Sequence, residues 1–516
     1  MSSNRDTSAA RRYHEATKHS VARLRAHPHS LDWDSKPPPF KIYPQIEPLP
    51  LPRALPAAAM PALTALARRE PAASDVAAPP SLEQLARLLH FSAGITRKKV
   101  YPDGQEHHFR AAACTGALYH IDLYVICGDL PGGLAAGVYQ FGPHNFALHR
   151  LRAGDHRGVF VDATGGEPAV AHAPVIIACA STYWRNAWKY QARAYRHCFW
   201  DTGTIAANLL AVAAADRLPA RVVCGFVDAA VGVLIGLDPG REGALALIAV
   251  GHAPETAAPP TPPLPPLVVQ TLPLSSHEVD YPAINALQSA SALLTADEVV
   301  VWRRAAAPAA RPSVPRGEVF PLRPLDTAAL PVETIDQVIQ RRGSARRFVS
   351  APIAFEALST LLQDSTGGVA SDFGESPNEL YLIVNAVAGL PAGTYVFHRD
   401  RQILEQLRAG DFRRAAGFLG LGQALPADAG VNLYLLCDLE RVLDRLGNRG
   451  YRVAQLDAAL TGGKLYLAAY ALRLGATGLT FFDDDVTAFF EPHAAGKSVM
   501  FLMAIGRGQR AASSAV

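Results

Sequence analysis

The chain has few of the residues that cross-link proteins or bind metals. Its 516 residues include only six cysteines, and these form neither a CxxC pair nor a metal-ligand pattern (Cys114, Cys127, Cys179, Cys198, Cys224 and Cys437). The 17 histidines show no metal-ligand spacing either. We therefore expect reduced thiols and no metal site.

An excess of charge and long apolar runs are also missing. The chain carries 49 basic and 46 acidic residues, so its net charge of +3 provides no large field for nucleic acid or a membrane surface. The first 20 residues lack the apolar core of a signal peptide, and no run approaches the roughly 18 apolar residues of a membrane span. No glycine-rich dinucleotide fingerprint follows a predicted strand. We expect a cytoplasmic protein.

What the chain does contain is enough apolar sequence for a large core. Apolar residues make up 49 % and charged residues 18 %, which is typical of a globular protein. At this length, two or three folded units are expected.

A repeated pentapeptide indicates how these units arose. LRAGD occurs at 151–155 and at 407–411, which is 256 residues later. The same separation relates Arg193 to Arg449, Arg196 to Arg452, Asp201 to Asp457 and Phe226 to Phe482, as well as GVY at 137–139 to GTY at 393–395. Because chance does not preserve register over nearly a hundred residues, the sequence predicts two copies of one domain that pack as an internal pseudo-dimer.

Composition sets the expected boundaries. We predict an N-terminal extension over 1–75 that covers the first domain, a first repeat over 76–255, a linker over 256–330 and a second repeat over 331–510. The proline-rich 258–267 predicts a stiff start to the linker, and the apolar spacing of 280–304 adds one or two helices.

Alternating β-rich and helical runs predict an α+β fold with a mixed sheet flanked by helices in each repeat. The expected strands of the first repeat are 120–127, 174–181, 221–227 and 244–250, with counterparts in the second. Residues 204–215 and 463–474 are alanine-rich and apolar nearly all round, so we expect buried helices there.

Three stretches carry chemistry. RRGSARRF, at 341–348, has the forked donors, hydroxyl and flexible glycine that suit a phosphate monoester, although a solvated helix end explains it too. FRAAACTGALYHIDLY, at 109–124, could pass under a flat ring or be a plain loop before a strand. WRNAWKYQARAYR, at 184–196, places Lys189 beside Tyr190, either as a proton-exchanging pair or as ordinary helix surface. The second repeat has Arg445 and Leu446 instead.

With these motifs the chain resembles the nitroreductase-like FMN flavoproteins, and specifically the tandem SagB/ThcOx-type dehydrogenases that oxidise azolines in modified peptides. The resemblance spans almost the whole length. It includes YHEATKHS and LDWD near the start, GALY, AWKYQARAYR, VVVWRR, RRGSARRF, and the closing LYLAAYALRLGATGLTFFDDDV and MAIGR.

The resemblance implies an FMN site shared between the two repeats. The implied phosphate ligands are Arg342, Ser344 and Arg346, supported by Arg341 and Arg507, and Gly478 would line the isoalloxazine. The first repeat would contribute Arg110, Cys114, Thr115 and Gly116, with Lys189 and Tyr190 as the catalytic pair.

The repeats differ in ways that imply one FMN site per chain and an empty second site. The first repeat has no RRGS counterpart and has His252 where the second has Arg507. The second has lost the loop, since 13 residues separate Gly367 from Tyr381 where 29 separate Gly94 from Tyr124. Five positions depart from the family: Ala113, Cys114 and Thr115 for Pro-Ser-Ala, His120 for proline and Thr204 for histidine. We expect Cys114 to be a loop contact and not a nucleophile.

Three functions remain open. The first is an FMN-dependent dehydrogenase acting on a thiazoline, oxazoline or related C–N or C–C bond of a peptide-like substrate, with a cyclodehydratase-type enzyme as a possible partner. The second is an NAD(P)H-dependent nitro or quinone reductase. The third is a flavin-less docking subunit of a peptide-modifying complex. Further association of two chains is left open.

Overall fold

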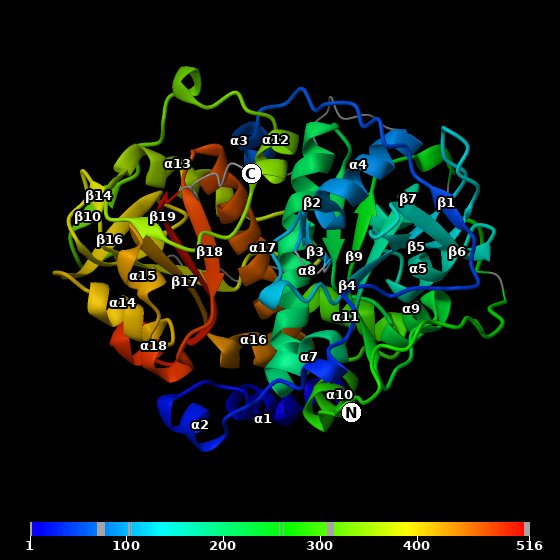
Figure 1. Cartoon of the computed structure of the whole chain (residues 1–516), viewed down its shortest axis with the longest axis horizontal. Coiled ribbons are helices and arrows are strands. Elements are labelled where there is room, and N and C mark those ends of the chain that lie inside the picture. Colours follow the sequence, from blue (N-terminus) through cyan, green and yellow to red (C-terminus); the bar gives the residue numbers. More distant parts are fainter. Residues whose placement is uncertain are drawn as a thin grey trace.

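The computed structural model describes residues 3–69, 78–101, 104, 106–256, 258–261, 263–306 and 314–509. The chain forms two similar α+β halves on either side of two central helices (Figure 1). The α+β prediction is confirmed, and the repeat seen in the sequence is a structural repeat.

Each half is built on one large sheet. The first sheet has the order β1 (Pro48–Pro50), β6 (Ala147–Ala153), β5 (Gly137–Gly142), β4 (Ile121–Cys127), β7 (Val175–Thr182), β9 (Glu242–Val250) and β8 (Ala220–Val223). The second has the equivalent order β10 (Val319–Pro321), β16 (Ile403–Ala409), β15 (Gly393–His398), β13 (Asn378–Val384), β17 (Val431–Cys437) and β19 (Ser498–Gly508), which pairs with both β11 (Phe348–Val349) and β18 (Gly475–Leu479).

The direction of the strands corrects one detail of the prediction. Every pair described within the two large sheets is antiparallel, whereas a mixed sheet was expected. The parallel pair of named strands joins the short β12 (Ile353–Ala354) and β14 (Val387–Ala388). The central strands are buried along their whole length, so their continuous apolar runs reveal burial but not direction.

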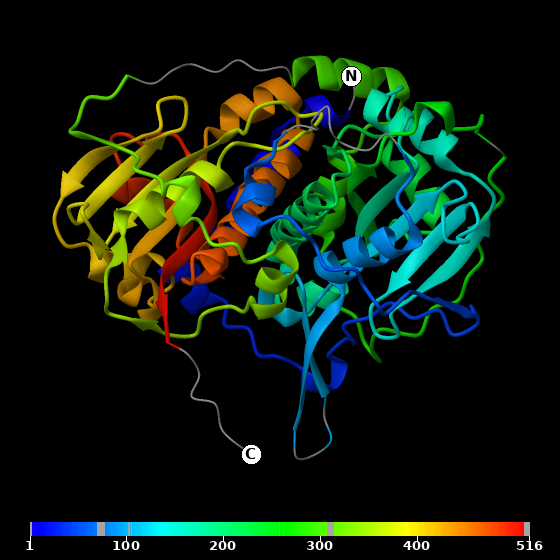
Figure 2. The same cartoon turned by 90° about the horizontal axis from the view of Figure 1, so that it is seen from above.

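The helices cover the sheets and meet at the junction. Those of the first half are α3 (Ala62–Ala67), α4 (Leu82–Ala93), α5 (Arg157–Ala163), α6 (Pro168–Ala171), α7 (Trp184–Tyr190), α8 (Ala194–Ala215) and α9 (Asp228–Ile235). Those of the second are α12 (Ile335–Arg341), α13 (Phe355–Ser365), α14 (Arg413–Leu419), α15 (Ala424–Asp428), α16 (Leu439–Leu446), α17 (Arg449–Ala471) and α18 (Asp483–Phe489). The two-stranded β2 (Ile95–Val100) and β3 (Glu106–Arg110) project from the body (Figure 2).

The long helices α8 and α17 lie side by side and obey the pseudo-two-fold relation. A Cβ on Gly203 of α8 would lie 2.7 Å from the Cβ of Ala459, and one on Gly463 of α17 would lie 2.6 Å from the Cβ of Ala207. These four residues are pairs at the 256-residue separation. The absence of a side chain at each glycine lets the two backbones approach closely.

Two buried ion-pair clusters join the halves. Arg193 and Arg196 of α8 reach Asp483 of the second half at 3.0 and 2.6 Å. Arg449 and Arg452 of α17 reach Asp228 of the first half, both at 2.6 Å. Each half therefore presents two arginines to an aspartate of the other, as expected for an isologous dimer interface.

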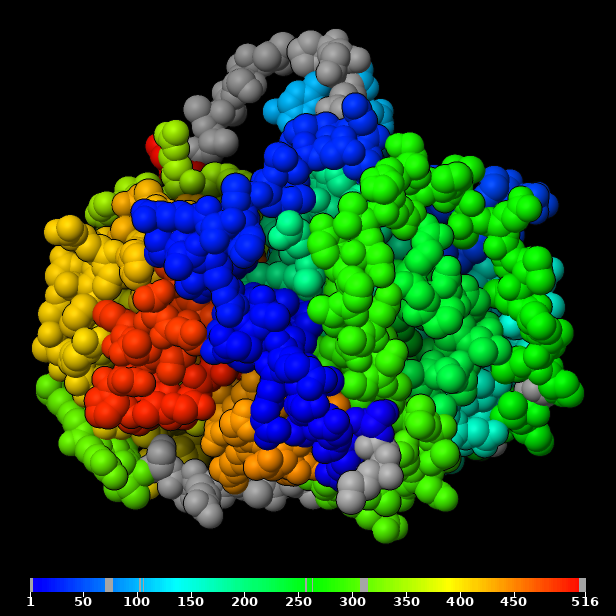
Figure 3. Space-filling model, turned by 90° about the horizontal axis from the view of Figure 1, so that it is seen from below, coloured from blue at the N-terminus to red at the C-terminus, as the bar shows by residue number. Residues whose placement is uncertain are grey.

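The N-terminal extension differs from the prediction because it crosses both halves and not the first alone (Figure 3). It contains α1 (Ser8–Ala16) and α2 (Val21–Ala26), and it hydrogen-bonds the second half where the backbone N–H of Asn448 donates to Asn4 O at 2.8 Å. It bonds the first half where Tyr13 Oη donates to Ala192 O at 2.6 Å.

The helices predicted in the linker are present as α10 (Pro282–Ala290) and α11 (Ala296–Ala305). Within the described residues, one helical stretch, Trp184–Ala215, has the length and apolarity of a membrane span. Of its most apolar window, 83 % is buried inside the protein, so burial in the core accounts for its composition.

Candidate functional site

Several of the residues expected to form one site come together from both halves. Arg342, just after α12, donates from Nε to the carbonyl of Ala111 at 3.0 Å and from a terminal nitrogen to that of Arg110 at 3.1 Å. An arginine of the second repeat is therefore held against the loop of the first. This contact joins the two halves at the place where the asymmetry of the repeats predicts a composite site.

A tyrosine that the sequence analysis did not single out connects the site residues contributed by the second repeat. The backbone N–H of Gly478, in β18, donates to Tyr466 Oη at 2.7 Å, and the same oxygen lies 3.1 Å from Ser344 Oγ. Tyr466 lies on the buried helix α17, where its aromatic ring looked like ordinary core. It brings the predicted phosphate and ring residues to one place.

Two buried cations in this region have no carboxylate partner within the described part of the chain. Arg110 is 5 % exposed, its Nε has no hydrogen-bond acceptor, and burial lowers its pKa to about 10. Arg342 is 8 % exposed, and burial lowers its pKa as well. Uncompensated buried charge is costly, so this pair favours an anionic or carbonyl-rich ligand and fits the group that the resemblance implies.

The other predicted phosphate ligands lie differently. Arg341 is turned toward Glu333, 2.6 Å away, and toward the carbonyl of Tyr470 at 2.7 Å, so it fastens α12 to α17. Arg346 and Arg507 are exposed, and the side chain of Arg507 donates to Pro352 O at 3.0 Å.

Asp201 of α8 anchors the loop of the first repeat. Its carboxylate accepts from Cys114 Sγ at 2.9 Å, from the backbone N–H of Thr115 at 2.9 Å and from Thr115 Oγ1 at 2.8 Å. His120 Nε2 donates to the same carboxylate at 2.9 Å, and its Nδ1 lies 2.8 Å from Ser181 Oγ. Cys114, Thr115 and His120, three of the positions that depart from the family pattern, therefore share one acceptor.

This anchoring also defines the state of the thiol. Burial, followed by the nearby charge of Asp201, raises the pKa of Cys114 well above its usual range. A thiol that stays protonated is a poor nucleophile, in keeping with its expected role as a loop contact. Thr204, where the family has histidine, donates to Ala113 O at 2.7 Å and fastens the same loop.

The candidate catalytic tyrosine touches this loop. Gly116 has a φ of 64°, and a Cβ at this residue would lie 2.7 Å from Tyr190 Oη. Burial is the main reason that the pKa of Tyr190 is raised, with further contributions from Asp201 and Cys114. Lys189 Nζ lies 5.4 Å from the centre of the Tyr190 ring. The pair is thus placed at the loop that the resemblance assigns to the flavin.

The pseudo-symmetric second site is filled by the chain. Val222 is the equivalent of Gly478, yet its N–H donates to Ala370 O at 3.0 Å and its carbonyl accepts from Asp372 N–H at 3.1 Å. The carboxylate of Asp372 then accepts from the backbone of Cys224 and Gly225, both at 2.7 Å. The shortened loop of the second repeat therefore occupies the strand edge that at Gly478 meets the hydroxyl of Tyr466 instead.

Of the RRGS motif, only the arginine pair has a counterpart in the first repeat. Arg68 and Arg69 stand 273 residues before Arg341 and Arg342, and Arg68 donates to Ala214 O as Arg341 does to Tyr470 O, its equivalent 256 residues later. The larger offset reflects the loop shortened in the second repeat. The similarity does not extend to the serine, because in the sequence Pro71 is the residue equivalent to Ser344.

The model of the nitroreductase family matches residues 76–252 and 339–507, which together make up most of the chain. The chain belongs to the nitroreductase family. Its two matched regions coincide with the two halves, so it is a tandem member.

Individual relatives agree with this assignment. A nitroreductase-family structure from Anabaena variabilis ATCC 29413 covers 98 % of this chain and is itself covered completely, with 25 % identity and a TM-score of 0.76. The nitroreductase-like protein MJ1384 of Methanocaldococcus jannaschii is 24 % identical over 182 residues, which is 34 % of this chain and 90 % of that protein.

A third relative is named for the processing of trifolitoxin. The trifolitoxin-processing protein TfxB of Rhizobium leguminosarum bv. trifolii is 29 % identical over 178 residues, which is 33 % of this chain. The match spans 47 % of TfxB, so it concerns about half of that protein.

Proposed function

We propose that this tandem nitroreductase is an FMN-dependent oxidoreductase of the SagB type. In this proposal it oxidises a thiazoline, an oxazoline or a related C–N or C–C bond in a peptide or peptide-like natural product. A cyclodehydratase-type enzyme that forms the ring would act before it. The similarity to TfxB supports a peptide substrate, and the observation that carries the proposal is the contact of Tyr190 Oη with Gly116.

The chain has the groups that FMN would need. Arg342 and Ser344 would hold the phosphate, with Arg346 and Arg507 as the further phosphate ligands that the resemblance implies. Gly478 would lie along the ring, and Arg110 and the Cys114–Gly116 loop would face it from the first half. Bound FMN would supply the hydride acceptor, to be reoxidised by oxygen.

The proton released when the ring becomes aromatic must go to the protein. Because its pKa is raised, the phenol of Tyr190 is protonated at neutral pH, so it can accept a proton only while passing its own to a neighbour. Lys189, whose Nζ lies 5.4 Å from the centre of the same ring, would be the neighbour that receives this proton, and only its neutral amine can do so. Tyr190 would then position the substrate proton and relay it.

Replacing the pair tests this division of roles. We expect Lys189→Ala and Tyr190→Phe each to lower kcat by about 10²- to 10⁴-fold, the usual value of a general base, while FMN content stays unchanged. Arg445→Ala is the matched control, because Arg445 holds the position of Lys189 in the second repeat and should be silent. Full turnover with bound FMN in both variants would rule out the assignment.

The number of flavins per chain tests the composite site. The visible spectrum and the flavin released from the denatured protein should give about one FMN per chain, because the second position is filled by Ala370 and Asp372. Two FMN per chain would contradict the filled site. No FMN, even after it is added, would favour a docking subunit without flavin.

A nitro or quinone reductase on the same scaffold makes a different prediction. NAD(P)H would then bleach the flavin rapidly, whereas the proposed dehydrogenase is reduced by the azoline peptide instead. Mixing each reductant with the protein without oxygen and following the flavin absorbance separates the two.

A further inference from the structure

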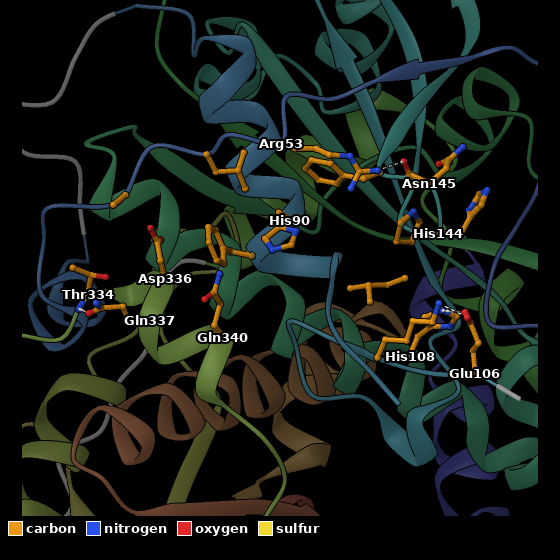
Figure 4. Close-up of a pocket in the computed structure, with 17 residues that line it drawn as sticks. Arg53, His90, Glu106, His108, His144, Asn145, Thr334, Asp336, Gln337 and Gln340 are labelled. Atoms are coloured by element: carbon orange, nitrogen blue, oxygen red, sulfur yellow. Dashed lines mark hydrogen bonds and ion pairs between the residues drawn. The ribbon is translucent and has the colours of Figure 1, made fainter. Parts of the chain in front are cut away.

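A polar pocket of about 700 Å³ lies beside the composite site and contains none of the residues assigned to FMN. Its walls come from both halves: α4, the β2–β3 hairpin and the β5–β6 turn on one side, and α12 on the other. Figure 4 shows the imidazoles of His90, His108 and His144 along the cavity and the amide of Gln340 on the α12 side, while Gln337 Oε1 accepts the backbone N–H of Thr334 at 3.0 Å. A volume of this size holds a ligand of several amino-acid residues.

The charged side chains that line the pocket differ in whether they are already paired within the protein. Both of its carboxylates are already committed: Asp336 accepts from Arg87 at 2.7 and 3.0 Å, and Glu106 pairs with Lys98 and His108. Arg53 is exposed and, within the described residues, meets only the carbonyl of Asn145 at 3.3 Å and the ring of Phe146. Its charge remains free for a carboxylate ligand.

Aromatic contacts connect the pocket to the site. Phe40 packs against His108 and His144, which line the pocket, at 5.6 and 5.4 Å between ring centres. The guanidinium of Arg110 lies 5.2 Å from the centre of the same ring, on the side of the composite site. The segment before Phe40 is tied to α7, because Trp188 Nε1 donates to Asp32 O at 2.7 Å. Residues 32–40 thus run from the pocket to the helix that carries Lys189 and Tyr190.

We propose that this pocket binds an acidic segment of the peptide substrate, next in sequence to the ring that is oxidised. The proposal rests on the proposed function for the identity of the ligand as a substrate. Arg53 would pair with an aspartate or glutamate side chain, and the exposed amide of Gln340 would bond the backbone of the peptide. The extended chain would then pass along residues 32–40 to Tyr190.

Peptide binding to the full-length protein, as purified, tests this without turnover. Two fluorescein-labelled hexapeptides, one with three glutamates and one with three lysines, are titrated at about 0.1 M salt and followed by anisotropy. We expect the acidic peptide to bind at least tenfold more tightly. Arg53→Glu should remove that preference, and Arg25→Glu, the same charge change on the distant α2, should leave it within twofold.

A variant that gains binding is also needed, because misfolding could cause a loss of binding but not a gain. Gln340→Arg adds a cation to the α12 wall and should tighten the acidic peptide several-fold. Equal binding of the two peptides, or equal effects of Arg53→Glu and Arg25→Glu, would overturn the pocket assignment. Selective binding of the acidic peptide without oxidation of an azoline placed in it would support the pocket and count against the proposed reaction.

Discussion

Asp483→Asn is expected to lower the free energy of unfolding by about 3–5 kcal/mol, because it leaves two buried arginines without a counter-ion. Arg196 is inaccessible and Arg193 is 4 % exposed, and both reach this one carboxylate. The same carboxylate accepts the backbone N–H of His19 at 2.8 Å, so the N-terminal extension is also fastened here. Urea unfolding followed by circular dichroism measures the loss.

The neighbouring residue provides the matched control. Asp484 lies on the same helix and pairs with Lys18 at 2.7 Å, but its side chain is 72 % exposed. An exposed pair contributes about 0–1 kcal/mol, so Asp484→Asn should change stability little. Equal losses in the two variants would show that the buried cluster has no special role.

The pH dependence of stability distinguishes the charge of Asp483 from its packing. The charges of Arg193 and Arg196 outweigh burial and hold the pKa of Asp483 well below its ordinary value. A depressed pKa contributes stability above the unfolded-state pKa of about 3.9, and that contribution is lost as the pH falls below it. The wild type should therefore lose more stability on acidification than Asp483→Asn, and parallel pH profiles would contradict the electrostatic explanation.

The second large effect concerns the cofactor. We expect Arg342→Ala to weaken FMN binding by roughly 10- to 100-fold, because a charged hydrogen bond contributes about 1.5–3 kcal/mol. The variant also loses the contacts to the carbonyls of Arg110 and Ala111, which hold the loop of the first half in place. Titration of the flavin-free protein with FMN, followed by flavin fluorescence, gives the affinity.

Arg341→Ala is the control, because Arg341 and Arg342 are adjacent in the sequence but their side chains point to different partners. Arg341 pairs with Glu333 and should cost stability without changing FMN affinity more than about twofold. If both variants lost FMN equally, the phosphate assignment would be wrong. Arg342→Lys should recover part of the affinity, because it restores the charge without the fork.

The register of the repeat and its motifs could be predicted from the sequence, because both depend only on the order of residues along the chain. The 256-residue separation survived in residues that the interface uses on both sides, such as Arg193 and Arg449, and these were aligned without any structure. Continuous apolar runs located the buried strands and the two central helices. Such strands and helices can be located because their burial is reflected in the composition and order of neighbouring residues.

Contacts across the junction were not readable, because each one depends on where the other half lies. Tyr466 looked like core until its hydroxyl was placed between Gly478 and Ser344, and Asp201 was only a matched repeat residue until Cys114, Thr115 and His120 converged on it. Similarly, Arg341 and Arg342 look equivalent in the motif. Only the structure shows that Arg341 joins α12 to α17 and that Arg342 contacts the loop of the first repeat.

The sequence by itself determined that the chain is a duplicated α+β protein whose halves have diverged, because duplication and loop loss leave a linear record. Tertiary structure alone decided that the strands are antiparallel, that the extension spans both halves and that Ala370 and Asp372 close the second site. Burial and hydrogen bonding between distant segments select these features, and neither is encoded in any local pattern.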